Sequence, residues 1–300
     1  MTRREPAAYR FAHEAMTTIF EVLIAGKSES YSSQAARALF DEVDRIEQLF
    51  NRFDPSSELS RIGRLQPGES MPIGVETYEC LTLAARVRTE TNGAFDINFR
   101  APRSNRRRPP DRAWDLIPCQ TLTGFEASRP RACGRKSPPP LDLDLGAIGK
   151  GYALDSALEV LKNWGIKNAL IHAGTSTALG IGPGPGSTGN ARGWPVGVAT
   201  AWECRGAPRT IRLLDRALSG SGTEVKGEHI RDPRTGTAAG GHLAAWACHP
   251  SAAVSDALST AFMVMGTEDV AAYCRGHRDV WGLVIIGEKK CRILNAKTVA

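Results

Sequence analysis

The sequence predicts an α+β fold in which mixed or antiparallel sheets are flanked by helices. Segments that alternate apolar and polar residues, such as 141–145, lie among segments with helical spacing, such as 251–265. The two kinds of segment do not alternate strictly along the chain, as they would in a parallel α/β sheet. The 300 residues, 42% of them hydrophobic, suffice for one large domain or two fused domains with a substantial core.

The first elements are predicted from residues 1–91. Residues 1–13 are expected to form a flexible tail, and residues 17–24 a strand. A helix is predicted from Ser32 or Ser33 to about Asn51, because either serine can cap it and its apolar residues recur at helical spacing. A turn at 53–59 leads into a short helix, and residues 76–91 form another, which ends at Asn92-Gly93.

The middle of the chain changes character. Residues 98–140 are rich in Arg and Pro and are expected to form an irregular loop. Order resumes at residues 141–145, predicted as a strand by their alternation. A turn of small residues at 146–149 precedes a helix that runs to about Trp164 and stops at Gly165.

The last elements are strands and one apolar helix. Strands are predicted at 168–173, 196–200 and 210–214. Ser251 can cap the apolar helix, which runs through Met265. Residues 280–286 and 291–294 form a closing hairpin around Gly287.

Charge and cysteine content exclude several classes of protein. The net charge is +6, with 32 acidic residues among 38 basic ones, so no nucleic-acid partner is predicted. Seven cysteines without a C-x-x-C pair speak against a disulfide framework and a zinc knuckle, and we expect them to be reduced. No stretch reaches the ~20 apolar residues that span a bilayer, and no secretion or lipidation signal follows Met1. We therefore expect a cytoplasmic protein without a membrane anchor.

The segment from Asp144 to Asp155 could bind phosphate. A predicted strand ends in an acid, a glycine-containing turn exposes its backbone, and a helix begins at Lys150. Helix N-termini attract phosphate through free N–H groups and the helix dipole. The glycines match neither the dinucleotide fingerprint nor the P-loop, however. From these residues alone, a strand–turn–helix without a ligand is the more frequent interpretation.

Asp256 and Thr260 could hold a metal ion. They are four residues apart on a predicted helix and so share one face. Their oxygens suit Mg²⁺, which takes one or two protein carboxylates together with phosphate and water. The alternative is a first-turn helix charge and a hydroxyl bonded to a carbonyl, which the residues alone favour.

Two further segments are weaker candidates. His229 precedes the turn Asp232–Gly236 and could be a general base or bind phosphate, although a lone histidine is more often structural. Gly93–Asp96 places a glycine, an aromatic residue and an acid where they could approach a planar ring. A helix stop followed by a strand start explains this second segment as well.

Taken in order, these segments resemble the FAD:protein FMN transferase family, ApbE. The matching motifs are Gly93-Ala-Phe-Asp96, Asp144–Asp155, Gly220–Gly222, His229–Gly236 and Asp256–Ala261. Met16-Thr17-Thr18 and Phe50–Ser60 match earlier family segments. The resemblance spans residues 14–297 and implies a two-lobed single unit over that range, with the 98–140 loop unmatched.

The resemblance implies an activity and its residues. A family member transfers FMN from FAD to a threonine or serine of a target protein through a phosphoester bond, releases AMP and needs Mg²⁺. The metal ligands would be the Ala147 carbonyl, Asp256 and Thr260, and the catalytic residues His229, Lys150 and Asp256. The residues implied to touch FAD are Met16, Phe53, Ala94, Phe95, Asp96, Asp144, Lys150 and His229. The target would carry a D-x-x-[ST]-G-A-T segment.

Three positions depart from the family pattern. Ala173-Gly174-Thr175 stands where the family has G-G-D or G-G-N, Gly220 replaces a threonine, and Phe53 replaces a tyrosine. Two alternatives therefore remain beside the transferase. One is an Mg²⁺-dependent pyrophosphatase that splits FAD into FMN and AMP. The other is a flavin-binding protein without catalytic activity.

Overall fold

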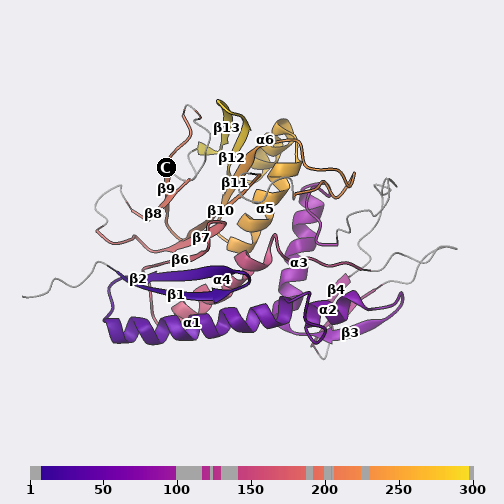
Figure 1. The fold of residues 1–300 in the computed structure, drawn as a ribbon, viewed down its shortest axis with the longest axis horizontal. Helices are drawn as coiled ribbons and strands as arrows, with labels where there is room; N and C mark the ends of the chain where they lie inside the picture. Colours follow the sequence, from indigo (N-terminus) through magenta and orange to yellow (C-terminus); the bar gives the residue numbers. More distant parts are fainter. Residues whose placement is uncertain are drawn as a thin grey trace, which may run out of the picture.

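The computed structural model describes residues 8–98, 117–121, 124–129, 141–186, 192–198, 204, 206–223 and 230–296. Its centre is an eight-stranded sheet of order β1-β2-β6-β7-β10-β11-β12-β13, with antiparallel neighbours throughout (Figure 1). The strands are β1 Tyr9–Ala15, β2 Thr18–Ile24, β6 Ala169–Ala173, β7 Thr177–Ile181, β10 Arg216–Gly222, β11 Ala244–His249, β12 Trp281–Gly287 and β13 Lys290–Leu294. The predicted α+β class is confirmed.

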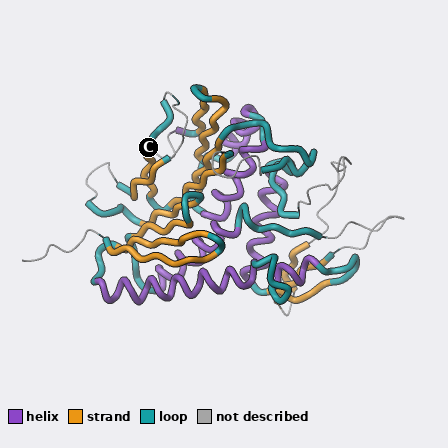
Figure 2. Tube along the Cα trace, viewed as in Figure 1, coloured by secondary structure: helices purple, strands orange, loops and turns teal. Residues whose placement is uncertain are grey.

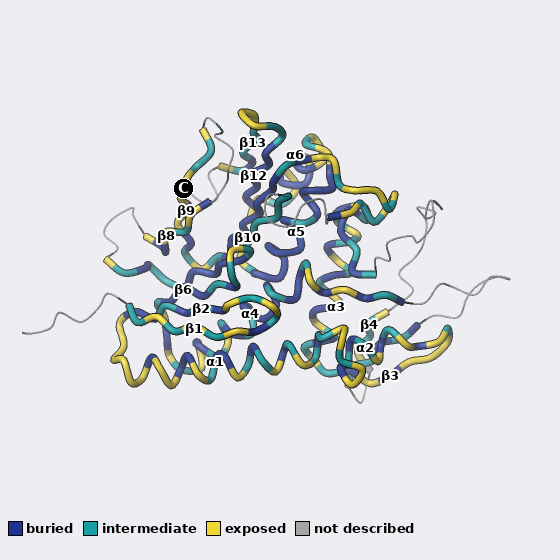
Figure 3. Tube along the Cα trace, in the orientation of Figure 1, coloured by how far each residue is buried: buried dark blue, intermediate teal, exposed yellow. Residues whose placement is uncertain are grey.

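Helices cover one face of this sheet and enclose the larger core (Figures 1 and 2). They are α1 Glu29–Phe50, α3 Val75–Glu90, α4 Gly149–Asn163, α5 Ala252–Val264 and α6 Thr267–Gly276. Helix α5 packs on β10 and β11 and also against α4. Figure 3 shows α5 buried along almost its whole length, whereas α1 is exposed along one side. Helix α5 is therefore the central helix of the molecule.

The opposite face of the sheet carries a second, smaller core. A two-stranded sheet of β8 Trp194–Gly197 and β9 Thr210–Leu213 contributes Ile211 and Leu213, which pack with Trp246, Trp281 and Leu283 of the main sheet. A separate three-stranded sheet lies beside the short helix α2, Glu58–Gly63 (Figure 1). Its strands are β3 Ser70–Ile73, β5 Gly124–Ser128 and β4 Ile117–Thr121, in the order β3-β5-β4.

The predicted N-terminal tail of residues 1–13 is wrong from Tyr9 onward. Tyr9–Ala15 pairs with β2 in seven antiparallel positions. The side chain of His13 lies 2.7 Å from Asp44 and stacks on Phe40, so β1 is also fixed to α1. Residues 1–7 lie outside the described part of the chain.

Three further elements also differ from the prediction. Helix α1 begins at Glu29 because the Ser28 hydroxyl, rather than Ser32 or Ser33, caps it. Strands β4 and β5 lie within 98–140, so that stretch is not wholly irregular. Residues 141–145 alternate between buried and more exposed positions but form only one bridge, Asn98–Leu143, among the described residues. Alternation predicted their burial correctly, but none of the described strands pairs with them along its length.

The expectation of reduced cysteines is wrong for one pair. Cys204 and Cys291 form a disulfide that ties the segment before β9 to β13. An odd count without C-x-x-C cannot exclude one bridge between residues 87 positions apart. The other described cysteines, Cys80, Cys119, Cys248 and Cys274, are free. Within the described ranges, no helix has the length and apolar character needed to cross a membrane.

Candidate functional site

The site is built where the start of α4 meets the start of α5. A Cβ on Gly151 would lie 2.2 Å from the Ala252 carbonyl oxygen, so only glycine allows the two helices this approach. At this contact the Gly151 N–H donates a 3.2 Å hydrogen bond to Oδ2 of Asp256. The glycine-containing turn and the metal-binding candidate of the sequence therefore belong to one site.

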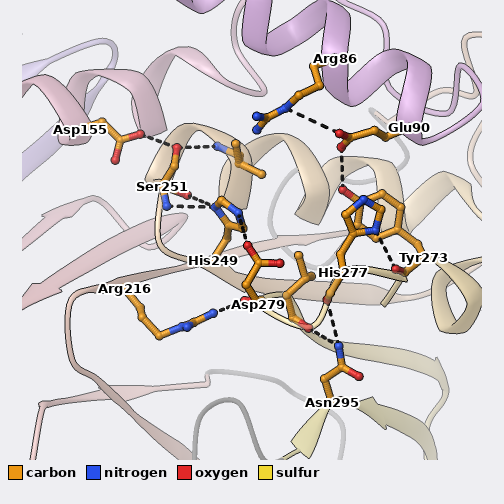
Figure 4. A network of polar contacts seen from close by, with 12 residues as sticks. Arg86, Glu90, Asp155, Arg216, His249, Ser251, Tyr273, His277, Asp279 and Asn295 are labelled. Atoms are coloured by element: carbon orange, nitrogen blue, oxygen red, sulfur yellow. Dashed lines mark hydrogen bonds and ion pairs between the residues drawn. The ribbon is translucent and has the colours of Figure 1, made fainter. Parts of the chain in front are cut away.

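Asp155 fixes the start of α5 against α4 (Figure 4). Its carboxylate accepts hydrogen bonds from the Ser251 hydroxyl at 2.7 Å and from the backbone N–H groups of Ala252 and Ala253 at 2.7 and 3.0 Å. A carboxylate at a helix N-terminus satisfies unpaired N–H groups and favours the helix dipole. The sequence analysis gave Asp155 no role of its own, although it is the last residue of the phosphate-binding candidate Asp144–Asp155.

Further hydrogen bonds near Asp155 also hold the start of α5 in place. The ring of His249 accepts a hydrogen bond from the Ser251 N–H at 3.0 Å, and its other nitrogen lies 3.2 Å from Asp279. Figure 4 shows these groups beneath the start of α5, with Arg216 bonded to the Asp279 carbonyl. Burial lowers the pKa of His249, although Asp279 opposes this shift.

Two oxygens near this contact have no hydrogen-bond donor among the described residues, and the Thr260 hydroxyl offers a third. Asp256 is buried, with 4% of its surface exposed, and no described residue donates a hydrogen bond to its Oδ1 atom. The Gly151 N–H bonds to Asp256, so it is not available to Ala147 four residues earlier. No described group donates to the Ala147 carbonyl. Thr260 lies one helical turn beyond Asp256. A carboxylate, a carbonyl and a hydroxyl form a donor set that suits Mg²⁺.

Lys150 already places a positive charge beside these oxygens. Its ammonium group donates a 2.7 Å hydrogen bond to the Gly146 carbonyl and lies 4.0 Å from Oδ2 of Asp256. Among the described residues, no group of three or more His, Cys, Asp or Glu side chains is placed to hold a metal ion. A metal ion here would depend on one carboxylate and on ligand oxygens supplied from outside the chain, as Mg²⁺ sites often do.

A chain of hydroxyl groups runs behind Thr260 and was missed by the sequence analysis. Ser221 of β10 lies 2.8 Å from the Ser259 hydroxyl and 3.3 Å from the Thr260 hydroxyl. The Ser259 hydroxyl donates to the Asp256 carbonyl at 2.8 Å. The sequence offered two signals, since Ser259 lies three residues after Asp256 and Ser221 belongs to the Gly220–Gly222 motif, but the contact between them depends on how β10 packs on α5.

An exposed aromatic ring lies at the rim of the site. Phe53 is 84% exposed, and the Arg52 guanidinium lies 5.3 Å from its ring centroid. Arg52 also donates a 2.6 Å hydrogen bond to Asp144, whose other oxygen accepts from the Gly146 N–H at 2.8 Å. The turn at 144–146 is thus tied to a free aromatic face that could stack on a planar ring. The sequence analysis did not identify Arg52.

The Gly93–Asp96 segment lies next to the turn at 144–146, but burial limits which of its atoms could contact a ligand. The Asp144 N–H donates to the Ile97 carbonyl at 2.8 Å. Ala94 and Phe95 are 1% and 3% exposed, so their side chains belong to the core and only their backbone could face a ligand. Asp96 is paired with Arg88 at 3.1 Å.

Met16 lies at the turn between β1 and β2. It has a φ of 48°, and its N–H donates a 2.8 Å hydrogen bond to Glu47 of α1. Residues 14–19 and Glu47 line an open depression of about 430 Å³. Glu47 lies in the last turn of α1, which leads into Arg52 and Phe53.

The structure therefore links Lys150 to Asp256 and to the turn that Asp144 closes. Ala147 lies in that turn, and Thr260 lies one helical turn beyond Asp256. His229 lies outside the described residues. The turn that follows it is described. Asp232 pairs with Arg234 at 2.9 Å, and the Arg234 side chain lies beside Gly93.

Comparisons with known proteins bear on the family and the fold. A model of the ApbE family matches residues 16–284. The FAD:protein FMN transferase of Escherichia coli K12 is 24% identical over 278 residues, which cover 85% of this chain and 78% of that protein. The apo crystal structure of Pseudomonas stutzeri flavinyl transferase ApbE superposes with a TM-score of 0.76 at 19% identity and 98% coverage of both chains. The flavin transferase ApbE from Vibrio cholerae gives the same TM-score at 21% identity, covering 98% of this chain and all of the other.

Proposed function

The chain belongs to the ApbE family, and we propose that it transfers FMN from FAD to a threonine or serine side chain of a target protein. One observation carries the proposal. The buried Asp256 carboxylate lies against the N-terminus of α4 with one oxygen free, beside a free carbonyl at Ala147 and the Thr260 hydroxyl. This arrangement suits a pyrophosphate held with Mg²⁺.

The reaction exchanges the phosphoanhydride bond in the pyrophosphate of FAD for a phosphoester bond to the target. The target hydroxyl oxygen bonds to the FMN phosphorus of FAD, and the bond from that phosphorus to the AMP oxygen breaks. The hydroxyl proton passes to His229, and AMP leaves with the bonding electron pair. Bound Mg²⁺ would neutralise the pyrophosphate charge and make AMP a better leaving group.

The chain's own groups supply positioning and charge. Lys150 and the positive end of the α4 dipole stabilise the oxygens of the transferred phosphoryl group, while the Gly149 and Gly151 N–H groups keep their acceptors within the chain. Leaving the Gly146 carbonyl frees the Lys150 ammonium for this contact. Phe53 offers its exposed face to a planar ring of FAD, and Arg52 holds Asp144 at the same rim. Met16, Asp96 and the backbone of Ala94 and Phe95 complete the proposed FAD contacts.

The proposed partner is a protein that carries a D-x-x-[ST]-G-A-T segment, whose threonine or serine accepts the FMN. No nucleic acid and no membrane anchor enter the proposal. The cellular location stays a prediction. The sequence favoured the cytoplasm, whereas a disulfide such as Cys204–Cys291 is typical of oxidising compartments. Fractionation of the native protein decides between the two.

One assay separates the proposed transfer from its alternatives. The purified protein is incubated with FAD, Mg²⁺ and a target bearing the acceptor segment, and the products are analysed by denaturing gel and AMP assay. In-gel flavin fluorescence of the target together with AMP supports the transferase. AMP without a fluorescent target identifies an FAD pyrophosphatase. FAD binding with neither product identifies a flavin-binding protein without catalysis.

A further inference from the structure

We infer that Ser221 and Ser259 form a hydrogen-bond relay that turns the Thr260 hydroxyl proton away from the metal ligand site. The relay rests on the proposed function, because it needs Thr260 as a metal ligand. Neither serine has to touch the metal or FAD. Both act through Thr260 and are therefore positioning residues.

The direction of the relay follows from counting protons. Each hydroxyl carries one proton to donate and can accept two hydrogen bonds. The Ser259 hydroxyl lies 2.8 Å from the Asp256 carbonyl oxygen, which can only accept, so the Ser259 proton occupies that contact. The 2.8 Å contact between Ser221 and Ser259 must then use the Ser221 proton.

Thr260 is left with one role toward Ser221. The Ser221 proton is already used, so the 3.3 Å contact between Ser221 and Thr260 requires Thr260 to donate. Its hydroxyl oxygen then presents lone pairs without a proton between it and a cation. A hydroxyl proton aimed at a cation would be repelled, so the relay prepares Thr260 to accept a metal ion before the ion arrives.

Burial keeps the relay in one direction. Ser259 is fully buried, so no water competes for its proton. Ser221 lies on β10, which packs directly on α5 (Figure 1), so strand and helix hold the three hydroxyls in register. Groups behind a metal ligand commonly change metal affinity by about 10- to 100-fold when removed.

The test measures Mn²⁺ affinity rather than turnover. Mn²⁺ is titrated into the protein with FAD present and the target protein left out, and the free ion is followed by electron paramagnetic resonance against a protein-free FAD blank. In Ser259→Ala, the Ser221 proton loses its acceptor and turns to Thr260, whose own proton then points outward. We expect the Mn²⁺ dissociation constant to rise about tenfold, and similarly for Ser221→Ala.

The double variant tests the order of the relay. Ser259 reaches Thr260 only through Ser221, so Ser221→Ala/Ser259→Ala should have the same Mn²⁺ dissociation constant as Ser221→Ala alone. Additive effects of the two substitutions would overturn the relay.

Ser255→Ala is the matched control. Ser255 is a fully buried serine of the same helix, but its hydroxyl donates to the Ala247 carbonyl at 2.7 Å, away from the relay. This variant should lose thermal stability and keep the wild-type Mn²⁺ constant. An equal loss of affinity in Ser255→Ala would show that helix displacement, not proton direction, causes the effect, and would overturn the relay.

The two proposals fail in different ways. Wild-type protein that binds Mn²⁺ with FAD and flavinylates its target, together with an unchanged constant in Ser259→Ala, overturns the relay alone. Wild-type protein that binds no Mn²⁺ in the presence of FAD overturns the proposed function and the relay with it.

Discussion

Asp256 supplies the one negative charge in the proposed ligand set. Asp256→Asn keeps the shape of the side chain and an oxygen that can accept the Gly151 N–H, so the melting temperature should change little. Without the charge, Mg²⁺-dependent transfer should fall to background. The measurement is flavin fluorescence of the target with and without EDTA. Normal turnover in the Asn variant, or no effect of EDTA on wild type, would contradict the site.

His229 is the proposed base for the target hydroxyl. His229→Ala should lower the rate of transfer by about 100-fold or more, which is the usual effect of losing a general base. FAD binding, measured by quenching of flavin fluorescence, should persist. Unchanged transfer would mean that His229 has a structural role.

At the scale of residues, the sequence predicted groups that are near one another along the chain. Asp256 and Thr260 were found because helical periodicity places them on one face. Ser221 is 39 residues from Thr260 and Arg52 is 92 from Asp144, so their contacts depend on how strands and loops assemble. The burial of Ala94 and Phe95 also depends on this assembly, so it could not be predicted from neighbouring residues.

At the scale of elements, a substitution at Gly151 tests the close contact between α4 and α5. Gly151→Ala places a Cβ 2.2 Å from backbone oxygen, which cannot move without separating the helices. Overpacking of this kind costs about 1–3 kcal/mol of unfolding free energy. We expect a lower midpoint in urea and a loss of transfer, because the Asp256 contact is made at this position.

Gly149→Ala is its matched control, two residues earlier in the same helix. A Cβ at Gly149 would meet Leu145 and Phe50 at 3.5 and 3.6 Å, which are ordinary contact distances. Alanine is also the better helix former. The control should retain its stability, and equal losses in both variants would contradict the close-contact explanation.

Elements with clear ends were predicted well, and buried strands were not. The predicted stop of α4 at Gly165 and the predicted cap of α5 at Ser251 are both confirmed. Strand β7 is buried at all five positions, so it shows no alternation. Strand β11 is rich in alanine and β10 contains two glycines, which are residues that disfavour strands when considered locally. Their position in the middle of the sheet overrides that preference.

The disulfide acts on the whole molecule because it joins the β8–β9 layer to the sheet edge. Closing a long loop typically stabilises a protein by about 2–4 kcal/mol. Dithiothreitol should therefore lower the melting temperature, and Cys204→Ser/Cys291→Ser should reproduce that value and no longer respond to the reductant. Thiol alkylation with mass spectrometry gives the oxidation state. A melting temperature that does not change when the disulfide is reduced would contradict this role.

Two histidines, His242 buried and His249 partly buried, contribute to the pH response of the fold. Burial lowers the pKa of His242 and of His249 below the ordinary value of 6.5. The unfolded chain then binds protons near pH 6.5 that the folded chain does not. The contribution of these histidines to the free energy of unfolding is therefore fully present above that pH and is lost as the pH falls below it. The melting temperature should fall between pH 7 and pH 5, and less steeply in His242→Gln. A flat profile would contradict the assignment.

The hydrogen bond from Gly151 to Asp256 joins groups 105 residues apart, and this separation has a consequence for synthesis. A nascent chain carries the glycine turn and the start of α4 long before Asp256 and Thr260 leave the ribosome. During that interval the Lys150 ammonium lacks its Asp256 neighbour, and the incomplete chain lacks two of its three proposed metal ligands. On the proposed mechanism, competence to cleave FAD would therefore arrive with the last part of the chain, and a fragment that ends before α5 should not consume FAD.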